Sequence, residues 1–408
     1  MKICIIAGLY KKHIVGGGEI YVQKIAEKLS KNNEVVIITT SPDASLKPTV
    51  EMDGHIKIYT FRPLLSIYDV SSVGSLAEIL RAIAATVIDV WNPHSYKVIK
   101  DILKKERPDV IHTNNIGHVS TSTFSAIKSV GIPCIHTCHS YQLLSIWPGL
   151  FNYRRGEIVR NFGFLERRYM GIKRRLTKSV DVVTAPSKFA LDMHLRHGFF
   201  KNAETVPLPV PINSRHAVKS TKNYSIIDIL YIGQLLMSKG IHVLINAVKQ
   251  LKQDNVRLHI VGKGAFEGKL KELAGDDFRI TFHGFVPHEK IGELYQRANV
   301  IVVPSIWYEN SPGVIYESFS YGTPVIGSRI GGIPELIDDS NGFLFEPGNE
   351  RELKEILEHL IENPSRLKKL EEGAFESVKR FDIDKHITVL EGLYRKYAAS
   401  RKNTLGEY

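Results

Sequence analysis

The sequence predicts an α/β protein of two domains, each built on a parallel sheet. The chain has 408 residues, which is enough for two domains that each have a core. Short apolar runs alternate with stretches of helical spacing, as in folds whose parallel strands are joined by helices. A proline-rich stretch at 207–211 and a polar run at 213–225 interrupt this alternation. We therefore expect a first domain over 1–207, a linker over 208–225 and a second domain over 226–380.

The first domain should begin with a strand, a glycine loop and a helix. Gly17 and Gly18 follow the first apolar run, and Tyr21, Ile25 and Leu29 then recur at helical spacing. A bare backbone at a helix N-terminus can bind an anion. The loop does not have the spacing G-x-G-x-x-G, so it predicts no dinucleotide site. Six strands are expected in this domain: Lys2–Ala7, Val35–Thr39, Ile56–Thr60, Val110–His112, Ile132–Thr137 and Val180–Thr184.

One histidine stands at the end of a predicted strand. His139 directly follows the strand that ends at Thr137, where open α/β sheets place their ligands. We therefore select His139 as a candidate functional residue; a loop histidine held by hydrogen bonds is the alternative. His112 and His136 lie within predicted strands and should be buried.

The second domain continues the same alternation. Its expected strands, separated by helical stretches, are Ile229–Ile232, Val256–Val261, Ile280–Phe282, Val300–Val303, Pro324–Ile326 and Phe343–Phe345. This order predicts another parallel sheet.

The most informative stretch is 303–335, which follows the strand ending at Val303. Glu309 lies in a loop, Ser311 and Pro312 read as an N-cap and a first helical residue, and Gly313 leaves the backbone open. The amides of Gly313 and Val314 would form an anion site. Glu317 lies about 6 Å further along the helix axis, at ~1.5 Å per residue. Such an array suits a nucleotide-sugar. Glu309 would accept hydrogen bonds from the sugar hydroxyls, the amides would bind the phosphate, and Glu317 would accept from the ribose. An ordinary capped helix with a solvated Glu317 is the alternative.

Glu309 and Glu317 are separated by seven residues, and this spacing resembles the E-x7-E signature of the family-four retaining glycosyltransferases. The following P-V-I-G-S-R-I-G-G-I-P-E resembles the second nucleotide-sugar loop of that family. The resemblance covers nearly the whole chain. It implies the GT-B fold, in which two doubly wound, Rossmann-like parallel-sheet domains face across a cleft. The first domain, completed by a C-terminal helix at about 381–408, would bind the acceptor. The second domain would bind the donor.

The resemblance also assigns roles to residues. Gly17 and Gly18 would close over the donor phosphate and sugar, and His139 occupies the position of the family's active-site histidine, although Ser140 follows it where Asp is usual. The stretch G-Q-L-L-M-S-K-G at 233–240 is similar to G-R-L-x-x-x-K-G, whose Arg and Lys neutralise the donor diphosphate. Lys239 matches this motif, whereas Gln234 stands in place of Arg and would give only a neutral hydrogen bond.

The positive charge is concentrated in the first half of the chain. Residues 1–207 carry 28 Lys and Arg against 17 Asp and Glu, whereas residues 208–408 carry 26 of each. In the window 153–178 an apolar stripe recurs at helical spacing among nine basic residues and two glutamates. We expect the stripe to pack internally while some basic residues face an anionic membrane or acceptor. The candidate residues are Arg167, Arg168, Arg174 and Arg175.

Other features limit the function and location. Cys4, Cys134 and Cys138 lie in or near apolar runs, which favours a reducing compartment. No run of about 18 apolar residues and no signal-peptide pattern occurs. We expect a cytoplasmic enzyme, peripheral on the inner face of the membrane, with a glycan or lipid-linked acceptor in polysaccharide biosynthesis. We expect no cofactor, no metal site and no nucleic-acid partner.

Two other classes of function remain open from the residues. One is a nucleotide-sugar epimerase or a phosphorylase of the same fold. The other is a non-enzymatic anion-binding protein, which would gain nothing from paired glutamates.

Overall fold

The computed structural model describes residues 1–11, 16–64, 84, 87–145, 150–212 and 222–405 of the chain. These residues form two compact units. The first unit contains residues 1–148, 161–208 and 384–408, and the second contains residues 149–160 and 209–383. Residues 150–160, which the sequence placed in the first domain, pack with the second unit. Most of the predicted linker, 213–221, lies outside the described residues.

The first unit carries an eight-stranded sheet with the order β10-β9-β6-β5-β1-β2-β4-β3. Neighbouring strands are parallel except β3 and β4. The chain moves outward from β1 in both directions, so the strand order reverses between β1 and β5, where such sheets bind ligands. The strands are β1 (Lys2–Ala7), β2 (Glu34–Thr40), β3 (Thr49–Asp53), β4 (Ile56–Phe61), β5 (Val110–Asn114), β6 (Cys134–Thr137), β9 (Val182–Ala185) and β10 (Glu204–Pro207).

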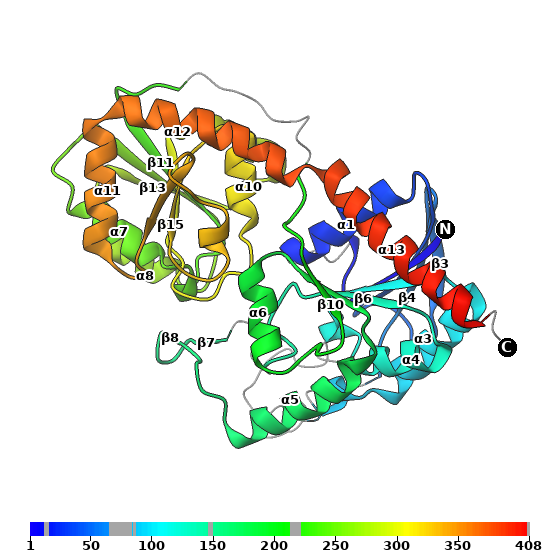
Figure 1. Cartoon of the computed structure of the whole chain (residues 1–408). Coiled ribbons are helices and arrows are strands. Elements are labelled where there is room, and N and C mark those ends of the chain that lie inside the picture. Colours follow the sequence, from blue (N-terminus) through cyan, green and yellow to red (C-terminus); the bar gives the residue numbers. More distant parts are fainter. Residues whose placement is uncertain (12–15, 65–83, 85–86, 146–149, 213–221, 406–408) are drawn as a thin grey trace. The chain divides into compact units, whose positions relative to one another are not determined.

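Helices cover this sheet, and one of them comes from the far end of the sequence. In the core, Ile3 and Ile5 of β1 share one cluster with Tyr21 and Ile25 of α1 and with Tyr394 of α13. The terminal helix therefore completes the first unit (Figure 1). The longer helices of the unit are α1 (Gly17–Leu29), α3 (Pro93–Glu106), α4 (Ser122–Val130), α5 (Phe164–Leu176), α6 (Lys188–Arg196) and α13 (Ile383–Leu405).

The second unit carries a six-stranded, wholly parallel sheet with the order β13-β12-β11-β14-β15-β16. Its strand order reverses between β11 and β14. The strands are β11 (Ile227–Ile232), β12 (Val256–Val261), β13 (Ile280–Gly284), β14 (Val300–Val303), β15 (Val325–Ser328) and β16 (Gly342–Phe345). The helices are α7 (Ile241–Lys249), α8 (Glu267–Ala274), α9 (His288–Arg297), α10 (Gly313–Ser320), α11 (Glu350–Glu362) and α12 (Pro364–Ser377). A short hairpin, β7 (Phe151–Asn152) and β8 (Glu157–Ile158), belongs to the same unit.

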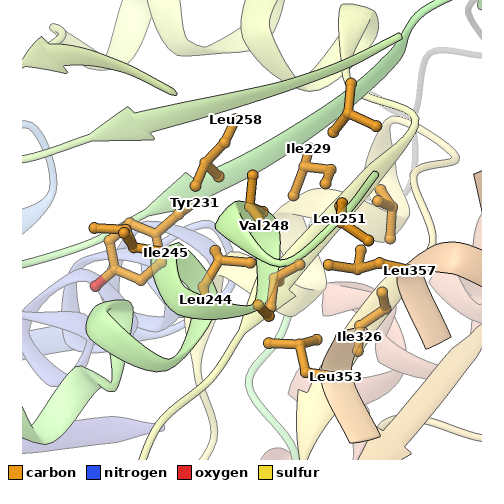
Figure 2. Close-up of a cluster of buried hydrophobic side chains, with 14 of the residues drawn as sticks. Ile229, Tyr231, Leu244, Ile245, Val248, Leu251, Leu258, Ile326, Leu353 and Leu357 are labelled. Carbon is orange, nitrogen blue, oxygen red and sulfur yellow. The ribbon is translucent and has the colours of Figure 1, made fainter. Parts of the chain in front are cut away.

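One of the buried clusters of the second unit lies between its strands and the helices α7 and α11. Figure 2 shows Ile229 and Leu258 from the sheet beside Leu244 and Val248 from α7 and Leu353 from α11. All five side chains are fully buried, so they fix the helices on the sheet through the hydrophobic effect. The predicted fold class, two doubly wound α/β domains, is confirmed.

Candidate functional site

The first cluster lies where β1, β5 and β6 end in the first unit. Gly18, in the first turn of α1, is closely approached by two side chains, because an added Cβ would lie 2.4 Å from Nδ2 of Asn115 and 3.3 Å from Cβ of His139. A Cβ added at Gly17 would meet no atom within 4 Å. The predicted glycine loop therefore packs against the predicted histidine, and it keeps an open backbone beside that contact.

His139 is positioned by residues that the sequence did not single out. Its Nε2 lies 3.0 Å from Oδ1 of Asn114, the last residue of β5. On another side, the ring of Tyr21 lies 4.6 Å from the imidazole, centroid to centroid, and the Tyr21 hydroxyl lies 3.0 Å from Nε2 of His386. Burial of the ring, together with the charge of His386, lowers the pKa of His139 to about 3, so the imidazole is neutral at pH 7.

The second cluster lies where β11 and β14 end in the second unit. Glu309 is 6% exposed, and three donors converge on its Oε1. They are Nζ of Lys239 at 2.8 Å, Oγ of Ser305 at 2.7 Å and Nε1 of Trp307 at 2.7 Å. Lys239 also lies over the Trp307 ring, 4.7 Å from its centroid. Two motifs that lie 70 residues apart in the sequence thus meet in one buried ion pair.

The environment of Glu309 keeps it ionised. Burial raises the pKa of this carboxyl, but the charge of Lys239 and the hydrogen bonds from Lys239, Ser305 and Trp307 outweigh burial and hold the pKa below its ordinary value. Its backbone is fixed by the second predicted loop: Gly332 N–H donates to the Glu309 carbonyl at 2.7 Å. Gly331 has a φ of +61°, and a Cβ there would lie 2.2 Å from the same carbonyl oxygen. Only glycine fits this approach.

Helix α10 begins one residue later than expected. The first helical residue is Gly313, and Pro312 is the N-cap with an extended ψ of 120°. Ser311 does not cap the helix, because its hydroxyl instead lies 2.5 Å from the Tyr316 hydroxyl. The first amides of a helix, here those of Gly313 and Val314, have no acceptor within the helix. An added Cβ at the exposed Gly313 would meet no atom within 4 Å, so this end is open to a ligand.

Glu317 lies one turn further along α10 and is held from behind. The hydroxyl of Tyr295 donates to its Oε2 at 2.8 Å. Tyr295 is fully buried and stacks on Tyr321, with ring centroids 5.2 Å apart and planes 7° from parallel. Burial, and then the charge of Glu317, raise the pKa of Tyr295 well above its ordinary value, so the phenol remains a donor.

Gln234 lies apart from these contacts. It is exposed, and its backbone carbonyl accepts a hydrogen bond of 2.9 Å from the hydroxyl of Tyr231. The next residue after Lys239, Gly240, has a φ of +69°, and its Cα packs against the Pro304 carbonyl at the end of β14. This contact keeps Lys239 close to Glu309. The loop after β11 therefore brings Lys239, but not the side chain of Gln234, to Glu309.

The basic window of the first unit differs from the prediction. Helix α5 spans only Phe164–Leu176, since the chain before its N-cap Gly163 is not helical. The apolar stripe is packed only in part: Phe162, Tyr169 and Leu176 are half-buried, whereas Leu165 is 79% exposed and Ile172 is 48% exposed. The buried face instead contains Met170 and Lys173, whose ammonium pairs with Asp89 at 3.3 Å. This remote partner holds Lys173 on the buried face and leaves Leu165 and Ile172 of the stripe exposed. All four predicted arginines are exposed: Arg167, Arg168, Arg174 and Arg175.

Several residues of the two clusters could not be selected from the sequence. Asn114 carried one usable signal, because it is a polar residue at the carboxyl end of a strand. Trp307 and Tyr295 carried none, since their roles depend on contacts with Glu309 and Glu317 that form only on folding. Gly331 lies in the predicted second nucleotide-sugar loop, but its approach to the Glu309 carbonyl could not be read from the sequence. Within the described part of the chain, no helix is both long enough and apolar enough to cross a membrane. The three cysteines are buried and form no disulfide.

Comparison with known proteins places the chain in a family. Residues 90–214 match the family described as "Glycosyltransferase Family 4", and residues 214–377 match "Glycosyl transferases group 1". A relative from Klebsiella pneumoniae, an uncharacterized 42.6 kDa protein in the cps region, is 27% identical over 350 residues. The match covers 82% of this chain and 87% of the relative.

Solved structures share the fold over almost the full length. Sucrose-phosphate synthase from Thermosynechococcus elongatus has a TM-score of 0.70 at 22% identity, covering 98% of this chain and 99% of the other. HepE from Anabaena, in complex with UDP, has a TM-score of 0.71 at 18% identity, covering 97% and 100%. These likenesses show the GT-B fold. The two consecutive family matches show that the chain belongs to the group 1 glycosyltransferases of family 4.

Proposed function

We propose that the protein is a retaining hexosyltransferase that takes its sugar from a nucleoside diphosphate sugar bound by the second unit. The observation that carries this proposal is the array along one loop and one helix: the Lys239–Glu309 pair, the open N-terminus of α10 at Gly313, and Glu317. The array supplies a cation, amide donors and two carboxylates, which are the groups that a diphosphate, a sugar and a ribose need. The UDP complex of the structural relative HepE supports the same class of donor.

The residues have separate parts in this reaction. When the glycosidic bond to the diphosphate breaks, negative charge grows on the leaving group, and Lys239 and the amides of Gly313 and Val314 stabilise it. The three donors to Glu309 all reach Oε1, and no described residue donates to Oε2. This second oxygen is therefore available to accept hydrogen bonds from the hydroxyls of the transferred sugar. Glu317, held by Tyr295, accepts from the ribose.

The first unit supplies the acceptor side of the reaction. We assign His139 to positioning the transferred sugar, and the open backbone at Gly17 and Gly18 to the donor phosphate and sugar. A neutral imidazole suits this role, since it can exchange hydrogen bonds with hydroxyls without adding charge. The relative from a cps region supports a glycan precursor as the acceptor.

A donor panel with product analysis tests the reaction. The purified protein is incubated with UDP-, GDP-, ADP- and dTDP-sugars, with glycan acceptors present. Transfer releases the nucleoside diphosphate, and NMR of the product reports whether the anomeric configuration of the donor is kept. A donor isomerised without release identifies an epimerase, and sugar 1-phosphate formed from inorganic phosphate identifies a phosphorylase. No change in any donor contradicts the proposal.

His139 is tested by separating turnover from donor binding. The variant His139→Ala should lose transfer activity while donor affinity in titration calorimetry stays near that of the wild type, because the group acts mainly in the transition state. Near-normal turnover in this variant would return His139 to the alternative of a hydrogen-bonded loop histidine.

The basic helix α5 supports attachment to an anionic membrane, and we propose that the protein binds its cytoplasmic face. Phe164, Leu165 and Ile172 expose 65%, 79% and 48% of their surface, and exposed arginines lie among them. Apolar side chains between cations are the composition of helices that lie in the interface of an anionic bilayer. A lipid-linked acceptor would then be within reach of the enzyme at the membrane surface.

The leaving group needs no metal ion in this proposal. The cations and dipoles assigned to the diphosphate, Lys239 and the N-terminus of α10, belong to the chain itself. Transfer should therefore persist in EDTA, and activity that returns only on addition of a divalent cation would contradict this part of the proposal.

A further inference from the structure

A cavity of about 680 Å³ opens in the first unit, beside the hairpin of β3 and β4. The loop after β1 and the end of β2 form its other walls. Its volume lies within the range of about 300–1,000 Å³ that is typical of small-molecule sites. None of the residues singled out from the sequence lines it. The residues that matter for its chemistry are Tyr10, Lys11, Asp43, Glu51, Asp53 and Thr60.

The hairpin presents polar side chains to this cavity at alternate positions. Thr49, Glu51 and Asp53 of β3 line the cavity, and Met52 between them also borders it. Thr60 of β4, the register partner of Thr49, lines it as well. Alternate residues of a strand share one face, so the polarity of this wall is fixed by the register of the hairpin. The floor is apolar where Ile58, the register partner of Glu51, is buried.

The charge of the cavity is opposite to that of the half of the chain that contains it. The lining holds the three carboxylates of Asp43, Glu51 and Asp53 against the ammonium of Lys11, which pairs with Asp53. Residues 1–207 as a whole carry 28 Lys and Arg against 17 Asp and Glu. Glu51 has no ion-pair partner among the described residues. A phosphorylated ligand would meet repulsion here, whereas an ammonium group would be attracted.

A second observation points to a ligand independently of this charge. Tyr10 lines the cavity and is 5% exposed, and its buried hydroxyl has no hydrogen-bond partner among the described residues. A buried hydroxyl without a partner costs free energy, and a ligand that accepts its hydrogen bond would remove this cost. Burial, followed by the charges of Asp53 and Glu27, raises the pKa of Tyr10, so the phenol keeps its proton and can donate.

We propose that this cavity binds the sugar of the acceptor, and that this sugar carries a free amino group and no phosphate. The inference rests on the proposed glycosyltransferase function and gives the acceptor its chemical class. The carboxylate of Glu51 binds the ammonium group, the threonine hydroxyls exchange hydrogen bonds with the ring hydroxyls, and the hydroxyl of Tyr10 gains the partner that it lacks.

The test uses the full chain and three methyl glycosides of one ring: a glucosaminide, a glucoside and a glucoside 6-phosphate. Saturation-transfer NMR and titration measure their binding at 0.1 M and 1 M salt. We expect the glucosaminide to bind about threefold or more tighter than the glucoside, with the preference reduced at high salt because of screening. The 6-phosphate should bind most weakly. Equal binding of the glucosaminide and the glucoside, or tightest binding of the phosphate, would overturn the proposal.

Variants connect this binding to the cavity. Glu51→Gln should remove the preference for the amine, and Glu51→Lys should shift the preference to the 6-phosphate. Tyr10→Phe keeps the ring but should weaken all three ligands by a similar factor. Glu34→Gln, on β2 but outside the cavity, is the matched control and should keep the wild-type preference. Variants that all behave like the wild type would overturn the location.

Failure of this proposal can be distinguished from failure of the proposed function. Nucleotide binding by the wild type is measured in the same samples by calorimetry. A protein that binds the nucleotide but no glycoside overturns the cavity assignment alone. A protein that binds the glucosaminide but no nucleotide overturns the donor assignment and leaves the cavity in place.

Discussion

The Nε2 atom of His139 lies 3.0 Å from Oδ1 of Asn114, and this contact joins the ends of two neighbouring strands, β5 and β6. An amide oxygen can only accept, so Nε2 carries the hydrogen and the imidazole is held as one tautomer. Asn114 is fully buried, which prevents the pair from rotating. The pair thus takes over the orienting role for which the sequence, with Ser140 after the histidine, offered no candidate.

This contact makes Asn114 a positioning residue, and Asn114→Ala should lower kcat of transfer while changing the KM for the donor little. Asn114→Asp keeps an acceptor and adds a negative charge beside the imidazole, so it should restore part of kcat and move the acid limb of the pH profile to higher pH. Asn92→Ala is the control, because Asn92 is also a buried asparagine of the first unit but caps α3 instead. A loss of kcat in the control as large as in Asn114→Ala would indicate general destabilisation.

Glu317→Ala should weaken nucleotide binding while the protein remains folded. A charge-assisted hydrogen bond to ribose contributes roughly 1.5–3 kcal/mol, and Glu317 lies at the surface of α10 rather than in the core. Tyr295→Phe removes only the bond that orients the carboxylate, so its effect should have the same direction and be smaller. Titration calorimetry with the nucleoside diphosphate measures both, and unchanged affinity in Glu317→Ala would remove this residue from the site.

Gln234→Arg should strengthen binding of the nucleoside diphosphate. The side chain is exposed and can extend from the loop after β11, and a guanidinium gives charge-assisted bonds in place of a neutral one. The expected gain is about 1 kcal/mol, roughly fivefold in Kd. Gln250→Arg adds the same charge at the exposed end of α7 and should leave Kd unchanged. An equal gain in both variants would show a long-range charge effect instead of a contact.

Buried histidines should make the stability of the first unit fall in mild acid. Burial, aided by the charges of His139 and His386, lowers the pKa of His112 to about 3, and burial lowers that of His194 to about 4. The unfolded chain therefore binds more protons than the folded chain below an ordinary histidine pKa of about 6.5. The free energy of unfolding should therefore rise with pH from the folded pKa values up to about pH 6.5 and level off above it. Each histidine adds up to about 1.4 kcal/mol per pH unit to this slope.

Urea unfolding between pH 4.5 and 7.5 measures this slope. His194→Leu should reduce the pH slope of the unfolding free energy by the contribution of one histidine. Leucine suits this position, because the His194 side chain packs among Phe199, Phe200 and Tyr141. A slope equal to that of the wild type would show that the acid sensitivity has another source, such as paired carboxylates.

The sequence predicted those parts of the fold and site that depend on local pattern. Strands such as Lys2–Ala7, Val256–Val261 and Val300–Val303 have the predicted bounds. In each, the polar or turn residues that flank the apolar run mark where the strand begins and ends. The edge strand β3 was missed, since its exposed residues Thr49–Asp53 show no apolar pattern. Local pattern also misplaced the face of α5, because the partner that turns Lys173 inward, Asp89, lies 84 residues away.

The same limit applies to the site. The spacing of Glu309 and Glu317 and the lysine at position 239 could be read from the sequence. That all the donors to Glu309 reach one oxygen, and that Gly331 fixes its backbone, depends on strands brought together by the sheet. Only the order β11-β14-β15 of the folded sheet makes these residues neighbours.

The outward stripe of α5 leads to the last prediction, reversible binding to anionic vesicles that weakens with salt. Each basic residue near an anionic surface contributes about 1 kcal/mol, and the exposed Leu165 and Phe164 add apolar area that can enter the interface. Replacing Arg167, Arg168, Arg174 and Arg175 together by Gln should abolish co-sedimentation with anionic vesicles. Leu165→Ser should weaken co-sedimentation at 0.1 M salt, because it removes apolar area from the interface without changing the charge.

The matched control replaces four exposed basic residues of the second unit, Arg351, Lys368, Lys369 and Lys379, by Gln. This variant loses the same charge, so retained binding would show that α5, and not net charge, makes the contact. The Debye length falls from ~10 Å at 0.1 M to ~3 Å at 1 M salt, so the wild type should leave the vesicles over that range. Equal pelleting with neutral and anionic vesicles, or full binding by the arginine variant, would contradict the membrane assignment. In that case the exposed stripe of α5 would have to contact a protein partner instead.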